Sequence, residues 1–203
     1  MLELTISGNF RPVIALLDSF ARSQIPFALA RALTWTARDA RDALRDQLPQ
    51  HFTIRNTRTR AGIHFRGAKK GDDPSAVVGS YDPYMARQAL GGVKKPTKGD
   101  TVAVPIGARP SPEAKTSPAK WPRRMLQKKR HHLREIRGGK AMIVKVKGKG
   151  AKRESVAQWI LVPQVTIPKR WPFFATVETT VAHNFQDNAH RSLQKALEAG
   201  PRR

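Results

Sequence analysis

Two runs of apolar residues with helical spacing, one toward each end of the chain, constrain the fold more than any other feature of this sequence. The first run begins at Pro26 and ends before Pro49, and the second begins near Trp171 and Pro172. Apolar residues recur in both at steps of three or four, which places them along one side of a helix. Proline favours the first turn of a helix and opposes its interior. The sequence therefore predicts two long amphipathic helices whose main buried residues are Leu33, Leu44, Phe174, Val181 and Phe185.

Between the two helices, the pattern changes to the alternation that is typical of strands. Strands are predicted at 51–56, 61–67, 75–81 and 100–107, and at 2–6 before a brief helix at 12–21. A short helix is predicted from Pro83 to Leu90, and a hairpin is predicted from 141–150 and 155–163. Residues 164–174 are predicted to be extended, with Val165 and Ile167 on one face. This strand is expected at an edge, because Pro163 and Pro168 donate no backbone hydrogen bond. This order predicts an α+β fold in which one antiparallel sheet packs against the long N- and C-terminal helices.

The whole chain, residues 1–203, is predicted to be a single domain with an extended basic and proline-rich arm or loop at about 107–140. Residues 107–123 hold four prolines and no apolar period, which favours extended conformations without helix or strand. We expect this part of the arm to contact a neighbouring subunit. Residues 125–140 are predicted to form a short basic helix that ends at Gly138 and Gly139.

The positive charge is concentrated in the middle of the chain. Of a formal net charge of +23, residues 51–150 carry +18, from 24 Lys and Arg against 6 Asp and Glu. A field of this sign attracts a polyanion such as nucleic acid, or matches acidic neighbours in an assembly. Aromatic residues are rare in the basic stretches, so the contact expected is with phosphates and is independent of sequence. The candidate residues that face nucleic acid are Lys128, Lys129, Arg130, Lys145 and Lys147.

Side chains suited to catalysis are few and scattered. Asp72 and Asp73 are adjacent in a Gly/Lys turn, whereas His183 and His190 lie two helical turns apart, too far for a shared metal ion. The chain has no cysteine, no phosphate-binding loop, no dinucleotide fingerprint and no nucleophile elbow. No catalytic, cofactor-binding or metal-ligating residue is predicted, and no cofactor. A small enzyme such as a nuclease is the least favoured interpretation of the function. A two-metal nuclease site needs more Asp and Glu residues than the basic region contains.

Three tryptophans are candidate anchors for protein contacts. Trp35 projects nearly opposite the apolar side of the first helix, where it either binds a partner or is covered by another layer of the same chain. Trp121 follows the proline-rich arm, and Trp171 precedes the last helix. No run of residues is long and apolar enough for a membrane span, and the N-terminus lacks the layout of a signal peptide.

Several stretches resemble phage minor tail proteins of the lambda tail-completion (minor tail protein Z) type. They are the Ala- and Arg-rich segment PFALARALTWTARDARDAL and the C-terminal strand and helix in WILVPQVTIPKRWPFF and ATVETTVAHNFQDNAHRSLQKAL. The resemblance is loose over about two thirds of the chain and closer over about 40 residues, and the proline-rich arm has no counterpart. It implies a non-enzymatic structural component near the head-proximal end of a bacteriophage tail.

Under this interpretation, we expect a homo-oligomeric ring, with a hexamer favoured, that contacts other tail and neck proteins. Its place would be the virion, and the host cytoplasm during assembly. The alternative is a free, sequence-independent DNA-binding protein. A mobility-shift measurement distinguishes them, because submicromolar, steeply salt-dependent binding by an isolated monomer favours the alternative.

Overall fold

The structure is a computed structural model that describes residues 11–70 and 74–199. Helix makes up 45% and strand 24%, and every strand pair is antiparallel, so the predicted α+β class with long terminal helices is confirmed. The strand predicted at 2–6 lies outside the described residues. The chain divides into two compact units, which we describe separately. Unit 1 comprises 1–47, 60–81 and 172–203, and unit 2 comprises 48–59 and 82–171.

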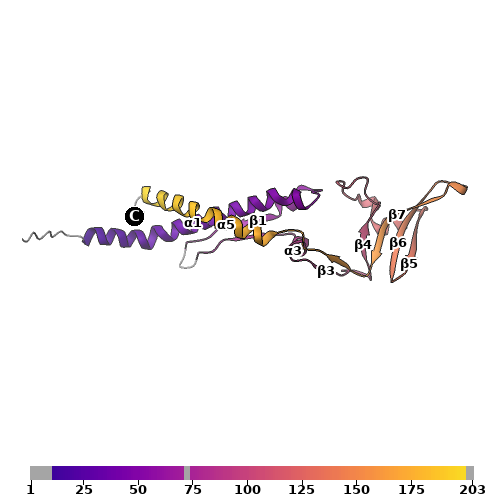
Figure 1. The fold of residues 1–203 in the computed structure, drawn as a ribbon, viewed down its shortest axis with the longest axis horizontal. Coiled ribbons are helices and arrows are strands. Elements are labelled where there is room, and N and C mark those ends of the chain that lie inside the picture. The colour runs from indigo at the N-terminus through magenta and orange to yellow at the C-terminus, as the bar shows by residue number, and fades with distance from the viewer. Residues whose placement is uncertain (1–10, 71–73, 200–203) are drawn as a thin grey trace, which may run out of the picture. The chain divides into compact units, whose positions relative to one another are not determined.

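In unit 1, helices α1 (Arg11–His51) and α5 (Phe173–Glu198) run side by side in opposite directions (Figure 1). Thr176 donates a hydrogen bond to Gln47 (2.7 Å) near the start of α5, and Ser192 donates to the carbonyl of Ala28 (2.7 Å) near its end. The predicted helix start at Pro26 is wrong, because α1 continues through this residue. Proline removes one backbone hydrogen bond from a helix, and the turn that follows it contacts α5 through the Ala28 carbonyl, which accepts from Ser192.

Small and polar residues, rather than the predicted apolar row, form the contact between α1 and α5. The buried residues of α5 are Asn188, Ser192 and Ala196. Opposite them, α1 buries Ala28, Ala32, Thr36 and Ala40. Small side chains let two helix backbones approach closely, and the buried polar groups pair, since Asn188 donates to Asp39 (2.8 Å) and to Thr36 (3.2 Å).

The predicted core is therefore correct only in part. Leu44 is fully buried, and Leu33 and Phe185 are half-buried. Phe174 and Val181 remain 50% and 40% exposed, so the prediction that they are core residues is wrong. The apolar period identifies a side of the helix, but it does not identify the row that a neighbouring helix covers.

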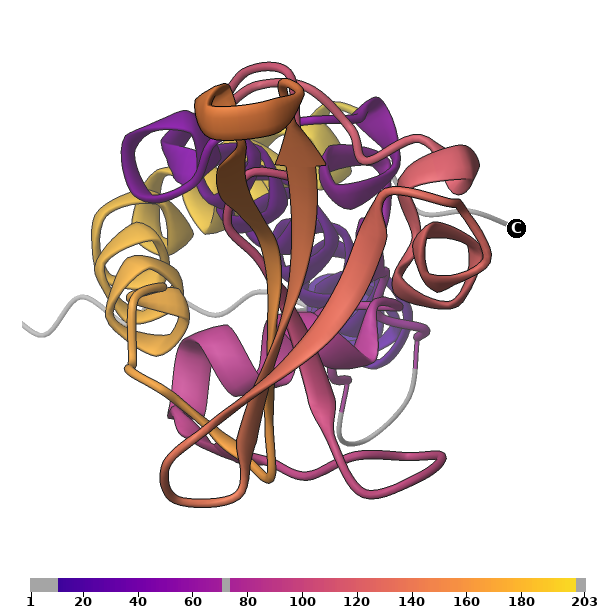
Figure 2. The ribbon, with the colours of Figure 1, turned by 90° about the vertical axis from the view of Figure 1, so that its right-hand side faces the viewer.

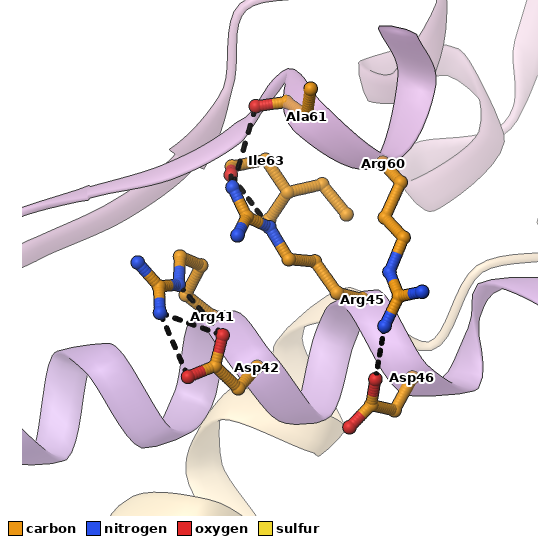
Figure 3. A network of polar contacts seen from close by, with 7 residues as sticks. All are labelled: Arg41, Asp42, Arg45, Asp46, Arg60, Ala61 and Ile63. Atoms are coloured by element: carbon orange, nitrogen blue, oxygen red, sulfur yellow. Dashed lines mark hydrogen bonds and ion pairs between the residues drawn. The ribbon is translucent and has the colours of Figure 1, made fainter. Parts of the chain in front are cut away.

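A short hairpin of β1 (Ile63–Arg66) and β2 (Val77–Ser80) completes unit 1. Arg45 of α1 donates two hydrogen bonds to the Ile63 carbonyl (2.6 and 3.1 Å), as Figure 3 shows. Asp46 pairs with Arg60 at 2.7 Å in the same network. Arg60 belongs to the short helix α2 (Thr57–Ala61), which lies between the segments predicted as strands at 51–56 and 61–67.

Unit 2 is built around a four-stranded sheet in the order β4-β7-β6-β5 (Figure 2). Its strands are β4 (Val102–Pro105), β5 (His131–Ile136), β6 (Lys140–Lys147) and β7 (Glu154–Val162), and the 3-10 turn η2 (Gly150–Lys152) joins the last two. The predicted hairpin of 141–150 and 155–163 is thus confirmed.

A smaller sheet pairs β3 (Gly92–Lys94) with β8 (Val165–Ile167). Within the described residues β8 has this one neighbour, which confirms the predicted edge strand. Helix α3 (Pro83–Leu90) has the predicted bounds. The strand predicted at 51–56 is wrong, because α1 extends to His51 and no strand follows it there.

The basic helix predicted at 125–140 is also wrong. Helix α4 (Pro122–Leu126) ends at Leu126, and the chain then enters strand β5. A helix here would stack like charges four residues apart, such as Arg130 and Arg134, which is unfavourable. Gly138 and Gly139 have φ angles of 80° and 67° and form the turn into β6. Glycine adopts this left-handed conformation without steric cost, so a pair of glycines suits the two-residue turn of a β-hairpin.

The segment before α4 packs against the large sheet. Ala108 and Met125 join Ile143 and Trp159 in a buried cluster, and Trp159 Nε1 donates to the Lys120 carbonyl (2.9 Å). The turn η1 (Pro118–Lys120) lies in the range that was predicted to lack helix and strand, whereas 107–117 has neither. Gly107 permits this packing, because a Cβ there would lie 2.4 Å from the carbonyl oxygen of Ala157.

Candidate functional site

Charge divides sharply between the two units. Unit 2 contains 24 Lys and Arg against 5 Asp and Glu, a net charge of +19, whereas unit 1 contains 14 against 10, a net charge of +4. Arginines of unit 1 also serve its own packing, as Arg45 does at the β1 carbonyl. The candidate contact surface for a polyanion therefore lies on unit 2.

The structure brings both groups of candidate cations, 128–130 and 145–147, to the same end of the β5–β6 pair, where the Val146 N–H donates to the Arg130 carbonyl (2.9 Å). Lys145 on β6 lies directly opposite His131 on β5, and Lys128 lies in the turn before β5, where its ammonium donates to the Ala119 carbonyl (3.0 Å). Lys129 and Arg130 are exposed in the same turn. Lys147 lies two residues after Lys145, at the same end of β6, and is opposite Glu154 of β7, so its charge has an acidic neighbour in register.

His131 is the member of this cluster that the sequence did not identify. Burial first, and then the positive charges of Lys145 and Lys128, hold the pKa of His131 below its usual value of 6.5. Its Nδ1 atom is enclosed and has no hydrogen-bond partner among the described residues. The alternation in HHLREI was the available signal, because a strand would place one histidine beside the cations of its partner strand.

The three candidate tryptophans have different surroundings. Cationic groups cover the half-buried ring of Trp35: Arg191 and Lys195 of α5 lie 4.4 and 5.5 Å from its centroid, and Arg31 lies at 5.3 Å. Of the two alternatives, coverage by the same chain is the arrangement present in the structure. Trp121 is 52% exposed and is available for a contact. Trp171 is 2% exposed, and its backbone N–H donates to the Gln88 carbonyl (3.0 Å), so this residue belongs to the core.

Unit 1 has two apolar hollows beside α1 and α5, of about 150 and 90 Å³, which share no lining residue. The larger is lined by Leu33, Thr36, Ala37 and Ala40 of α1, by Ala76 and Val78, and by Val177, Val181 and Phe185 of α5. The smaller is lined by Ile25, Ala28 and Leu29 of α1 and by Ala189 and Leu193 of α5. None of these residues is charged. The sequence prediction did not anticipate the hollows, because it assigned the α5 residues to a filled core.

A hollow in unit 2 has a volume of about 440 Å³. Arg55, Arg170 and His51 line it together with apolar side chains such as Phe52 and Met85. At its wall the hydroxyls of Thr59 and Tyr84 lie 2.8 Å apart, and Tyr84 donates to Asp82 (2.8 Å). Burial is the main reason that the pKa of Tyr84 is raised. This hollow is suited to an anionic group, because its lining contains cations and no carboxylate.

The described part of the chain shows no cluster of three or more His, Asp and Glu side chains with the geometry of a metal site. Over the same residues, no helix has the length and apolar character that a membrane span requires. Comparison of the chain with known protein families, with curated proteins and with solved structures finds no match.

Proposed function

We propose that this chain is a non-enzymatic structural subunit of a bacteriophage tail, which assembles with copies of itself and faces viral DNA with unit 2. The observation that supports this most is the separation of charge, +19 on unit 2 against +4 on unit 1. One part of the chain is suited to a polyanion, and the other can approach like-charged copies at low electrostatic cost.

The proposed location is the head-proximal end of the tail, in a homo-oligomeric ring, with a hexamer favoured. There the subunit contacts other tail and neck proteins, caps the tube, and assists head joining and DNA passage. It acts in the virion and, during assembly, in the host cytoplasm. The resemblance of its N-terminal helix and its C-terminal strand and helix to phage tail-completion proteins supports this choice among structural roles.

The test replaces Lys128, Lys129 and Arg130 with Gln in the phage genome. Their side chains are exposed, so folding is expected to be unchanged. Tails should assemble, whereas the fraction with attached heads, or the fraction of joined particles that eject DNA, should fall. A matched control replaces Lys94, Lys95 and Lys98 with Gln. These side chains are also exposed, and the three substitutions remove the same amount of positive charge.

Two results would contradict parts of this proposal. Failure at the tail-assembly stage would mean that the cations pair with acidic surfaces of neighbouring tail proteins rather than with DNA. A phage that lacks the whole gene but yields normal particles would exclude the structural role itself.

The same basic unit 2 is also compatible with a free, sequence-independent DNA-binding protein. The distinguishing measurement is a mobility shift with the purified chain. Submicromolar binding by a monomer, together with normal tails in its absence, would favour this second function.

A further inference from the structure

The hollow of about 440 Å³ in unit 2 is lined by side chains from three separate segments of the chain. They come from 51–59, from α3 at 84–88, and from Arg170 before α5, and all of them belong to unit 2. Sites for small molecules typically have volumes of roughly 300–1,000 Å³. The hollow is therefore large enough for a ligand of about the size of a mononucleotide, whereas a bare inorganic anion would leave most of it to water.

Two arginine side chains of the lining are available to an anion. The Arg55 Nε donates to the Pro112 carbonyl (2.8 Å), and the terminal amino groups of its guanidinium have no partner among the described residues. Arg170 is exposed, and its backbone N–H donates to the Gln88 carbonyl (2.8 Å), which fixes the start of its side chain at the hollow. Neither arginine has an ion-pair partner within the described ranges.

The positive charge at the hollow has no carboxylate in the lining to offset it. The carboxylate of Asp82 is buried nearby, where it accepts from the Tyr84 hydroxyl (2.8 Å) and lies 3.9 Å from Arg58. Burial, and then the charge of Arg55, lower the pKa of Arg109, so a further cation lies within electrostatic reach. Like charges around a concave surface focus its field, and an anion bound there would relieve their repulsion.

The donors in the lining favour a phosphate over a carboxylate. Arginine forks bind both groups through two oxygens at a time. The Asn56 Oδ1 accepts from the Thr59 N–H (3.2 Å), so the NH₂ group of this amide remains a donor beside the two arginines. A carboxylate has two oxygens for these groups, whereas a phosphate monoester has three terminal oxygens.

Aromatic side chains form another part of the lining. The rings of His51 and Phe52 lie edge to face, with centroids 6.5 Å apart. Tyr84 is 44% exposed, and its hydroxyl lies 2.8 Å from that of Thr59. Aromatic rings stack on nucleobases without selecting among them. A ligand that joins a phosphate to a flat ring can use both parts of the lining.

We propose that this hollow binds a nucleoside monophosphate, either free or at the end of a DNA strand, with its phosphate at Arg55 and Arg170 and its base against the aromatic side chains. The site goes beyond the proposed function, and none of the five candidate cations lines it. Tail assembly does not require it, so a result against this site leaves the tail function standing.

The first experiment measures the binding of adenosine monophosphate and of adenosine to the purified full chain by calorimetry, after bound nucleic acid is removed at high salt. We expect the monophosphate to bind at least about tenfold more tightly, because adenosine lacks the charge-assisted hydrogen bonds. Arg170→Gln, and separately Arg55→Gln, should weaken the monophosphate by at least about tenfold and leave adenosine unchanged.

The matched control is Arg87→Gln, which removes the same charge from an exposed residue of α3 outside the lining. It should bind the monophosphate like the wild type, and circular dichroism should show the same secondary structure in all variants. Absence of binding by the monophosphate, equal affinity for adenosine, or equal losses in Arg170→Gln and Arg87→Gln would overturn the proposal.

A second experiment identifies the source of the ligand with two single-stranded oligonucleotides that differ only in a 5′ phosphate. Tighter binding of the phosphorylated strand by the wild type, with no such difference in Arg170→Gln, would support a strand end. Equal binding of the two strands, together with binding of adenosine monophosphate, would support a free nucleotide.

Discussion

At the scale of single residues, the group opposite a charged side chain determines its role. Arg31 and Arg45 have backbone or hydroxyl acceptors within unit 1, at Ser192 and Ile63 respectively. Their charge is therefore used for packing, and Arg31 also lies over the Trp35 ring. Lys129 and Arg130 instead project from an exposed turn of unit 2. A count of charges along the sequence combines these two kinds, and only the second kind is available to a polyanion.

His131 provides a test at this scale. Burial, Lys145 and Lys128 lower its pKa, so removing one of these charges should raise the pKa toward its ordinary value. We expect Lys145→Gln to shift the imidazole titration to higher pH in an NMR experiment. Lys140→Gln, at the far end of the same strand pair opposite Ile136, is the control and should leave it unchanged. An unshifted titration in Lys145→Gln would contradict the arrangement of β5 and β6.

The same group makes stability depend on pH with a definite sign. Because the pKa of His131 is lower in the folded chain, the unfolded chain binds more protons at mildly acidic pH. The free energy of unfolding should therefore decrease as the pH falls from about 6.5 toward the folded pKa. Above that range His131 is neutral in both states, so it should add no pH dependence. Lys145→Gln should reduce this dependence, which urea denaturation at several pH values measures.

At the scale of secondary-structure elements, α1 and α5 show how two amphipathic helices pack without using their largest residues. The contact uses Ala28, Thr36, Asn188 and Ser192, and the bulky rows border it. Close approach of the backbones strengthens dispersion contacts along the interface. The consequence is an element pair that is held together while aliphatic side chains such as Val181 and Leu193 stay partly exposed.

A pair of truncations distinguishes the buried residues from the exposed ones. Leu44→Ala removes a fully buried side chain from α1 and should lower the free energy of unfolding by about 2–5 kcal/mol. Phe174→Ala removes a larger side chain that is 50% exposed, and it should cost less, on the order of 1 kcal/mol. Chemical denaturation of the two variants measures both values. A loss for Phe174→Ala as large as that for Leu44→Ala would mean that other residues of the same chain cover the Phe174 side chain.

At the scale of the whole molecule, one chain combines a nearly balanced helical unit with a strongly basic sheet unit. Under the proposed function, assembly and polyanion contact depend on different units of the chain and can be altered independently. Contacts with phosphates act by releasing counterions, so they respond to salt rather than to nucleotide sequence.

This separation leads to a prediction for the purified protein and duplex DNA. Replacing Lys128, Lys129 and Arg130 with Gln should reduce the slope of log affinity against log salt by about three, equally for unrelated DNA sequences. The double variant Val181→Ser with Leu193→Ser should keep the slope per chain, because its changes lie in unit 1. Fluorescence anisotropy over a salt series provides the measurement. Unequal losses on different sequences would indicate base readout and contradict the phosphate mode.

The sequence by itself determined the class of fold, the two terminal helices, helix α3, the β6–β7 hairpin and the edge position of β8. These features depend on local spacing, on proline chemistry and on turn residues, which act within a few residues of each other. Tertiary structure alone decided that Pro26 lies inside a helix, that HHLREI is a strand beside β6, and that Val181 and Phe174 are exposed. Each of these depends on a partner distant in sequence: Ser192 for the turns after Pro26, Lys145 for His131, and the small residues of α1 for α5. A local pattern shows which side chains are apolar, and only the distant partner determines which of them are covered.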